Sequence, residues 1–155
     1  KLVAGRVPLL IELKDQQGEL GPTDGKLEAA TAQALADYEG PVAVMSFNPY
    51  SVIIMARLMP HVPRGITTSS FDPADWQPIA PAICDRLREI PDYDHAKACF
   101  ISHEARDLDR ARVTELRNAG AVILCWTITS PEAEAEARKY AQNITFEQYL
   151  PTFPA

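Results

Sequence analysis

The chain has 155 residues, a mass of 17.1 kDa and a formal net charge of −6. Because about 100–200 residues make one domain, this length fits one domain or part of one. Apolar residues make up 46% and charged residues 23%, which excludes a disordered tail, a collagen-like fibre and a membrane bundle. The acidic balance argues against a nucleic-acid binder, whose footprint is a basic patch. No apolar stretch approaches the ~20 residues that span a membrane.

The cysteines indicate the compartment. Their number is odd, and Cys84, Cys99 and Cys125 form neither a CxxC pair nor a Cys/His metal-ligand spacing. Cys99 and Cys125 lie within apolar runs, where free cysteine behaves as a small hydrophobe. We therefore expect a reducing compartment and a cytoplasmic protein. The sequence has no recognisable signal peptide. It opens at Lys1 rather than at methionine, which leaves a shortened expression product, a processed product and a fragment open. The other patterns favour a fragment, so we expect residues 1–155 to be part of one larger domain.

Six short apolar runs alternate with amphipathic stretches along the chain. Each run is mostly continuous rather than alternating, which is typical of parallel strands covered by helices. The predicted strands are Val7–Leu13, Val42–Phe47, Gly65–Thr68, Ala98–Ser102, Ala121–Ile128 and Asn143–Phe146. The predicted helices between them are Lys26–Tyr38, Pro49–Met59, 73–90, Asp107–Ala119 and Pro131–Ala141.

Repeated strand–helix units imply a parallel sheet. Two architectures fit the pattern, an open doubly wound sheet and part of a (β/α)8 barrel. No glycine-rich phosphate fingerprint follows any strand, which disfavours the nucleotide-binding version of the first. A barrel usually takes ~250 residues, so six strands in this chain leave room for two more of the eight.

The first predicted strand ends in two opposite charges on one face. Glu12 and Lys14 are two residues apart and therefore point the same way. They lie where parallel barrels keep their active sites. Two interpretations are open. One is a structural ion pair, whose burial would cost several kcal/mol per ion. The other is a carboxylate that binds a hard divalent cation beside a lysine that meets phosphate.

Three further strand ends carry candidate residues. Asn48 is expected mainly to cap the following helix, while Ser46 or Phe47 could line a pocket. Trp126 ends a buried strand, where it could be core or a pocket wall. His103 also follows a strand, but a lone histidine is more often structural than catalytic.

Taken in order, these segments resemble the glycerophosphodiester phosphodiesterase family, in particular its bacterial branch. Glu12-Leu13-Lys14 looks like its Glu-x-Lys motif, Ser46-Phe47 like its Ser-Phe strand end and Trp126-Thr127 like its Trp-Thr strand. Arg64-Gly65-Ile66 stands where its next strand starts. Asn143-Ile144-Thr145 stands where it ends the barrel, although Phe146 and Glu147 follow in place of the family's usual Asp. The resemblance implies a (β/α)8 barrel of which this chain holds the third to eighth strands.

The resemblance also implies roles for four residues. Glu12 would be one ligand of Mg2+ or Ca2+, and Lys14 would contact the phosphodiester as a catalytic and substrate-binding residue. Phe47 and Trp126 would shape the glycerol side of the pocket. The substrate would be a small-molecule glycerophosphodiester, cleaved to glycerol 3-phosphate and an alcohol.

The family's His-Arg-Gly and His-Asp segments do not occur in this chain. They supply its acid and base histidines, so we expect this chain alone to be inactive. The missing strands would leave two open barrel edges, which either further strands of the protein or copies of this chain would cover as a homo-oligomer. The alternatives to an enzyme fragment are a non-catalytic barrel remnant that acts as a binding or assembly module, and a different phosphate-handling barrel.

Overall fold

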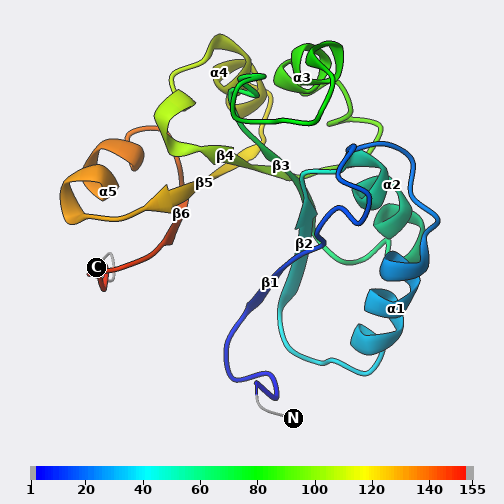
Figure 1. The fold of residues 1–155 in the computed structure, drawn as a ribbon. Helices are drawn as coiled ribbons and strands as arrows, with labels where there is room; N and C mark the ends of the chain where they lie inside the picture. The colour runs from blue at the N-terminus through cyan, green and yellow to red at the C-terminus, as the bar shows by residue number, and fades with distance from the viewer. Residues whose placement is uncertain (1–2, 153–155) are drawn as a thin grey trace.

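The computed structural model describes residues 3–152 and contains one six-stranded parallel sheet (Figure 1). The strands are β1 (Leu9–Glu12), β2 (Val42–Ser46), β3 (Arg64–Thr68), β4 (Phe100–Glu104), β5 (Val122–Ile128) and β6 (Asn143–Phe146). The helices are α1 (Lys26–Leu35), α2 (Pro49–Leu58), α3 (Pro81–Arg88), α4 (Ala111–Asn118) and α5 (Pro131–Ala137), with a short 3-10 turn, η1 (Ala105–Asp107), before α4.

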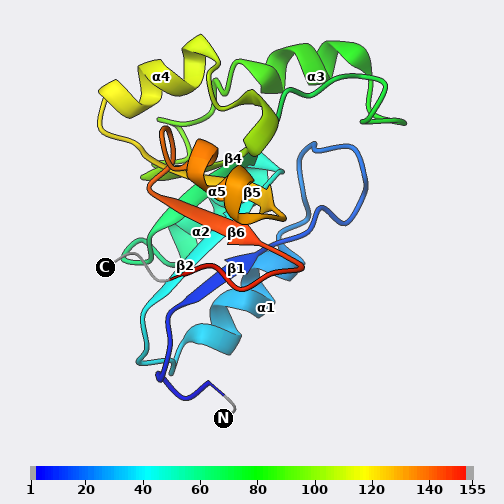
Figure 2. The ribbon, with the colours of Figure 1, turned by 90° about the vertical axis from the view of Figure 1, so that its left-hand side faces the viewer.

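The order of the strands decides between the two predicted architectures. Each strand pairs in parallel with the next along the chain, in the order β1-β2-β3-β4-β5-β6. The sheet curls, and the helices lie on its convex side (Figure 1). In the perpendicular view α3 and α4 lie together above the sheet and α1 lies below it (Figure 2). A doubly wound sheet would carry helices on both faces. The fold is therefore part of a (β/α)8 barrel, as predicted.

Burial differs between the middle and the ends of the sheet. Every residue of β3 and β4 is buried, as the continuous apolar runs predict for strands covered on both faces. Along β5 burial alternates, because Ile123 and Cys125 face the helices while Val122 faces the concave side and is 44% exposed. Leu10 on β1 is 42% exposed. The concave face is thus open near the two edge strands.

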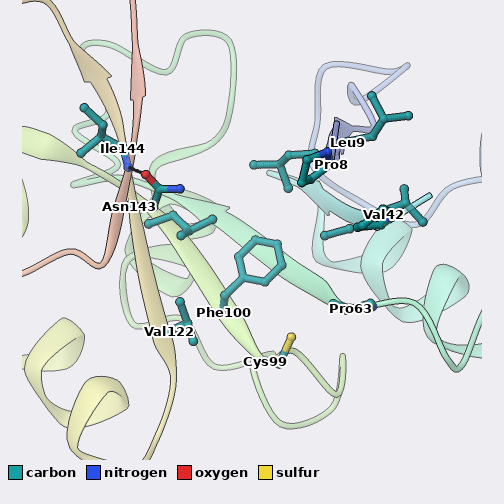
Figure 3. Close-up of a pocket in the computed structure, with 13 residues that line it drawn as sticks. Pro8, Leu9, Val42, Pro63, Cys99, Phe100, Val122, Asn143 and Ile144 are labelled. Carbon is teal, nitrogen blue, oxygen red and sulfur yellow. Dashed lines mark hydrogen bonds between the residues drawn. The ribbon is translucent and has the colours of Figure 1, made fainter. Parts of the chain in front are cut away.

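The open concave face forms a cavity of about 660 Å³ at the amino-terminal ends of the strands. Figure 3 shows Phe100 projecting into it, with Pro8, Leu9 and Val42 on one side and Asn143 on the other. Its lining is mostly apolar, drawn from the starts of all six strands or the residues just before them. In a closed barrel this volume would be filled by interior side chains.

Several expected elements differ in extent or environment. The helix predicted over 73–90 is restricted to Pro81–Arg88, because prolines are favoured in a helix's first turn and disrupt its interior. Residues 72–80 form a loop instead. The helix predicted over Asp107–Ala119 is divided into η1 and α4. Cys99, expected to be buried in an apolar run, is exposed at the cavity and donates its thiol hydrogen to the Arg64 carbonyl.

Gly65 leaves the space that Phe100 occupies. The two residues are register partners on β3 and β4. A Cβ atom on Gly65 would lie 2.2 Å from the Phe100 ring. An aromatic ring on one strand therefore requires the absence of a side chain on its neighbour.

We predict that Gly65→Ala lowers the free energy of unfolding by about 1–3 kcal/mol, the usual cost of overpacking a core. The measurement is urea unfolding followed by circular dichroism. Gly21→Ala is the matched control, because a Cβ there meets nothing within 4 Å and the backbone φ is not positive. Equal stability of the two variants would contradict the packing argument.

Candidate functional site

The predicted site residues come from three strand ends at the carboxyl-terminal edge of the sheet. Glu12 ends β1 and Lys14 follows it, Phe47 follows β2, and Trp126 lies near the end of β5. Glu12 is the register partner of Met45, and Phe47 is two residues further along the same face. The structure therefore brings all four residues to one end of the sheet.

Glu12 and Lys14 form an ion pair. The Lys14 Nζ donates to the Glu12 Oε1 at 2.8 Å. The side chain of Lys14 is 73% exposed and that of Glu12 is 21% exposed, so the pair is not buried as one interpretation of the sequence required. An exposed pair contributes at most about 1 kcal/mol to stability. Such a lysine can exchange its carboxylate partner for an anion at little cost in folding energy.

Phe47 and Trp126 form an aromatic wall beside this pair. Their ring centroids are 5.4 Å apart with an interplanar angle of 83°, an edge-to-face contact. The Trp126 indole Nε1 donates to the Ser102 carbonyl at 3.0 Å, which fixes the ring against β4. Both rings are half-buried, so each keeps a surface that a ligand could contact.

Asn48 and Ser46 are structural. Asn48 caps α2, as predicted, because its Oδ1 accepts from the Tyr50 backbone N–H at 2.9 Å. Its Nδ2 donates to Asp15 Oδ1 at 2.6 Å and to the Gly21 carbonyl at 2.8 Å. Ser46 is fully buried and donates to the Leu13 carbonyl at 2.6 Å, so it does not line a pocket. These bonds hold the loop after β1, which carries Lys14, against the start of α2.

Sequence reasoning did not single out Glu104 at the end of β4. Glu104 pairs in register with Trp126, and its carboxylate accepts from Arg106 and from the N–H and hydroxyl of Ser70. Burial opposes ionisation, but these hydrogen bonds prevail and lower its pKa. The sequence did contain a signal for this position. Residues two apart on a strand share a face, so Glu104 is expected on the same face as Ser102.

Buried hydroxyls accompany this carboxylate on the concave face. Thr67 and Ser102 are register partners on β3 and β4, and both are buried. Their hydroxyl oxygens have no hydrogen-bond partner among residues 3–152. The concave face is therefore polar towards the carboxyl ends of the strands and apolar at the other end.

Sequence reasoning also missed Trp76, which lies in the loop expected to be helical. Its ring centroid is 5.0 Å from that of Phe47 and 4.8 Å from that of the fully buried Phe71. Trp76 and Phe47 line a cavity of about 300 Å³ together with Glu12 and Lys14. No sequence pattern within residues 72–80 points to this position, because the contact depends on how the loop folds back over the strand ends.

His103 is structural, the more common role of a lone histidine. It lies on the face of β4 towards the helices and is fully buried. Its Nδ1 accepts from the Thr68 hydroxyl at 2.7 Å, and its Nε2 donates to Asp107 at 3.2 Å, the pattern of a neutral imidazole. Burial lowers its pKa, and Asp107 offsets only part of that effect.

Within the part of the chain that the structure describes, no cluster of three or more His, Cys, Asp or Glu side chains could hold a metal ion. Mg2+ and Ca2+ prefer several oxygen ligands. Glu12 alone therefore does not make a complete site. In the same residues no helix is long and apolar enough to cross a membrane.

Three solved structures that resemble this fold are described as phosphodiesterases. A putative glycerophosphoryl diester phosphodiesterase from Agrobacterium tumefaciens matches with a TM-score of 0.66 at 16% identity, covering 88% of this chain and 52% of its own. A glycerophosphodiester phosphodiesterase from Parabacteroides distasonis gives 0.64 at 15%, covering 90% and 52%. An Oleispira antarctica phosphodiesterase, solved in complex with the product sn-glycerol-3-phosphate, gives 0.60 at 20%, covering 81% and 48%.

The sequence comparisons are negative, since no family model and no curated protein match the chain. The chain spans about half the length of the three solved structures described above. At these identities the likeness concerns the fold. The chain therefore has the fold of part of a (β/α)8 barrel of the kind found in glycerophosphodiester phosphodiesterases.

We predict that His103 makes stability depend on pH. Its pKa is lowered in the folded state from an ordinary value of 6.5, so the unfolded chain binds the proton more readily. The stabilisation is complete above about pH 6.5 and is lost as the pH falls below it. Melting temperatures between pH 7.5 and 5 should fall more steeply for the unsubstituted chain than for His103→Gln. His95→Gln is the exposed control and should follow the unsubstituted chain, and parallel curves for all three proteins would contradict the assignment.

Proposed function

We propose that this chain carries the substrate-contacting part of a glycerophosphodiester phosphodiesterase, whose reaction yields glycerol 3-phosphate and an alcohol. The observation that carries the proposal is the exposed Lys14 ammonium, paired with Glu12 and adjoining Phe47 at the carboxyl ends of the strands. Two further facts support it: solved phosphodiesterases share the fold, and one of them is described with bound sn-glycerol-3-phosphate.

Each side chain has a role suited to its chemistry. A phosphodiester is an anion, and its oxygens gain charge as the bond to the alcohol breaks. The Lys14 ammonium would contact these oxygens and offset the developing charge. Phe47 and Trp126 would pack against the glycerol carbons and orient that arm of the substrate.

Glu12 is the residue of this chain that we propose as a ligand of a divalent cation. It would supply one carboxylate to Mg2+ or Ca2+. The described residues do not fit a complete site, because the ion needs further oxygen ligands. When bound, such an ion offsets phosphate charge and orients the substrate. We derive no step of the reaction through it.

The described residues also offer no histidine for proton transfer. His103 is buried on the opposite face of β4. His61 and His95 precede β3 and β4, at the opposite end of the sheet. Missing general acids and bases cost about 10²–10⁴-fold each in rate. We therefore propose that this chain alone does not turn over substrate, and that residues 1–155 form the carboxyl-terminal portion of a barrel domain completed by other strands.

The Lys14 proposal predicts weak binding of sn-glycerol 3-phosphate by the chain itself, in EDTA. Titration followed by 1H–15N NMR should show saturable shifts near the β1 end. Lys14→Ala should weaken this binding at least about 10-fold, because a charge-assisted hydrogen bond of about 1.5–3 kcal/mol is lost.

The matched control is Lys26→Ala. Lys26 is also exposed and pairs with a carboxylate, Asp24, at 2.7 Å, but it lies on α1 outside the cavity. This variant should bind as the unsubstituted chain does. Equal affinities for all three proteins, or no binding by any of them, would overturn the assignment of Lys14.

The apolar cavity between β1 and β6 favours one alternative, a non-catalytic barrel remnant that acts as an assembly module. The cavity is about 660 Å³ and mostly apolar, and both edge strands are uncovered within residues 3–152. Uncovered strand edges pair readily with other chains. In this alternative, copies of the chain cover each other's concave faces as a homo-oligomer.

The assembly alternative predicts a mass above 17.1 kDa in light scattering coupled to size-exclusion chromatography. Leu10→Lys combined with Val122→Lys should return the chain to a monomer, because both side chains lie on the exposed concave face. Leu150→Lys is the control, since Leu150 is exposed but does not line this cavity. A monomer at all concentrations would contradict the alternative.

We retain the proposal of a reducing, cytoplasmic compartment. It is supported by Cys84, Cys99 and Cys125, all of which are free thiols.

A further inference from the structure

A small polar cavity lies between the loop after β1 and the first turns of α1 and α2, and the proposed function does not use it. Its volume is about 70 Å³. Such a volume admits a few water-sized groups, because about 10–15 Å³ is enough for one water molecule. The charged residues that line it are Lys14, Asp15, Asp24 and Glu28.

The carboxylate of Glu28 is only half satisfied in this cavity. Glu28 is 2% exposed. Its Oε1 accepts from the Ser51 hydroxyl and, at 3.2 Å, from the Thr23 hydroxyl. Its Oε2 is buried and has no hydrogen-bond partner among residues 3–152, and the carboxylate has no ion-pair partner among them. Buried charges in proteins are normally paired or coordinated to a metal.

The two neighbouring helices do not supply the missing partner. Glu28 is the third residue of α1, and Ser51 is the third residue of α2. The amino termini of helices carry a partial positive charge, which attracts a carboxylate. The N–H groups of these first turns nevertheless do not reach Oε2. The cavity is therefore the place from which a partner for this oxygen can come.

The other two carboxylates of the cavity already have partners. The Asp15 Oδ1 accepts from the Asn48 amide, and its Oδ2 accepts from two backbone N–H groups. Asp24 forms an ion pair with Lys26 at 2.7 Å. Neither carboxylate is free to share a divalent ion with Glu28, in keeping with the absence of a three-ligand metal cluster from residues 3–152.

The ammonium that lines the cavity is also engaged. Lys14 donates to Glu12, which does not line this cavity. One carboxylate charge, that of Glu28, is then left to be matched from within the cavity. A single negative charge matches a monovalent cation, whereas Ca2+ and Mg2+ prefer several oxygen ligands.

We propose that Glu28, Thr23 and Ser51 form a binding site for a monovalent metal cation, Na+ or K+. These ions take oxygen ligands, and the site offers a carboxylate and two hydroxyl oxygens in a cavity with room for water to complete the coordination. The cation would tie the loop after β1 to both helices. The proposal does not rest on the proposed function, because it uses no property of Lys14 as a substrate-binding residue.

The test compares NaCl, KCl and N-methyl-D-glucamine chloride at constant ionic strength, so that charge screening is the same in all three. The organic cation is too bulky for this cavity, and EDTA neutralised with it removes divalent ions. Na+ or K+ should shift the 1H–15N NMR signals of Thr23, Glu28 and Ser51 saturably, and the lower Kd identifies the preferred ion. At about ten times that Kd the melting temperature should rise by about 3–5 °C, because the ion binds the folded chain.

Glu28→Gln should weaken the binding of the cation at least about 10-fold, because the charged ligand is lost while its shape is kept. Ser51→Ala should weaken it about 2- to 10-fold. Glu134→Gln is the matched control. Glu134 is also a buried carboxylate, but it is bound to Arg138 and Tyr149 and lies on α5, so this variant should bind the cation as the unsubstituted chain does. If Glu28→Gln does not fold, as judged by circular dichroism, Ser51→Ala and the comparison of the three chlorides still decide.

Three results would overturn the site. Equal NMR spectra and melting temperatures in the three chlorides would mean that water alone fills the cavity. Unchanged affinity in Glu28→Gln would remove the carboxylate as a ligand. Ca2+, added without EDTA, that bound more than about 10-fold more tightly than Na+ and K+ and also required Glu28 would contradict a monovalent site.

Discussion

Parallel pairing of consecutive strands is the constraint on which the rest of this structure depends. Because each strand pairs with the next in sequence, the sheet curls and all helices lie on its convex side. Parallel pairing also brings every strand's carboxyl end to the same edge. Glu12, Phe47, Glu104 and Trp126 therefore meet although they are far apart in the chain. The same geometry leaves a concave face whose opposite end is apolar and open.

The site depends on a few buried polar contacts beneath it. Lys14 lies beyond the end of β1, in a segment without regular structure. Asn48 holds that segment by bonds to Asp15 and Gly21, while the same side chain caps α2. One amide thus couples the start of a helix to the position of the exposed ammonium. A capping residue here has a consequence for the site that helix stability alone would not indicate.

Sequence patterns predicted the strands well because a buried parallel strand must be apolar on both faces. The prediction was least accurate where that condition fails. Burial in β5 alternates because the concave face is open. Helix α1 buries the carboxylate of Glu28 against the Ser51 hydroxyl, which no apolar pattern anticipates. Trp76 could not be placed from the sequence, since its position depends on a loop that folds over a distant strand end.

The carboxyl-terminal edge of the sheet carries side chains suited to contacting a ligand but not side chains suited to proton transfer. An exposed ammonium beside aromatic rings offers charge and apolar contact, neither of which needs proton transfer. Proton transfer needs positioned groups of suitable pKa. His103 does not meet this need, because it is buried on the face of β4 towards the helices and burial lowers its pKa. Binding groups and reacting groups in a barrel come from different strands, which lie around one rim. A chain with six of the eight strands can therefore carry an exposed ammonium and an aromatic wall at this rim and still lack, within its described residues, the groups that transfer protons.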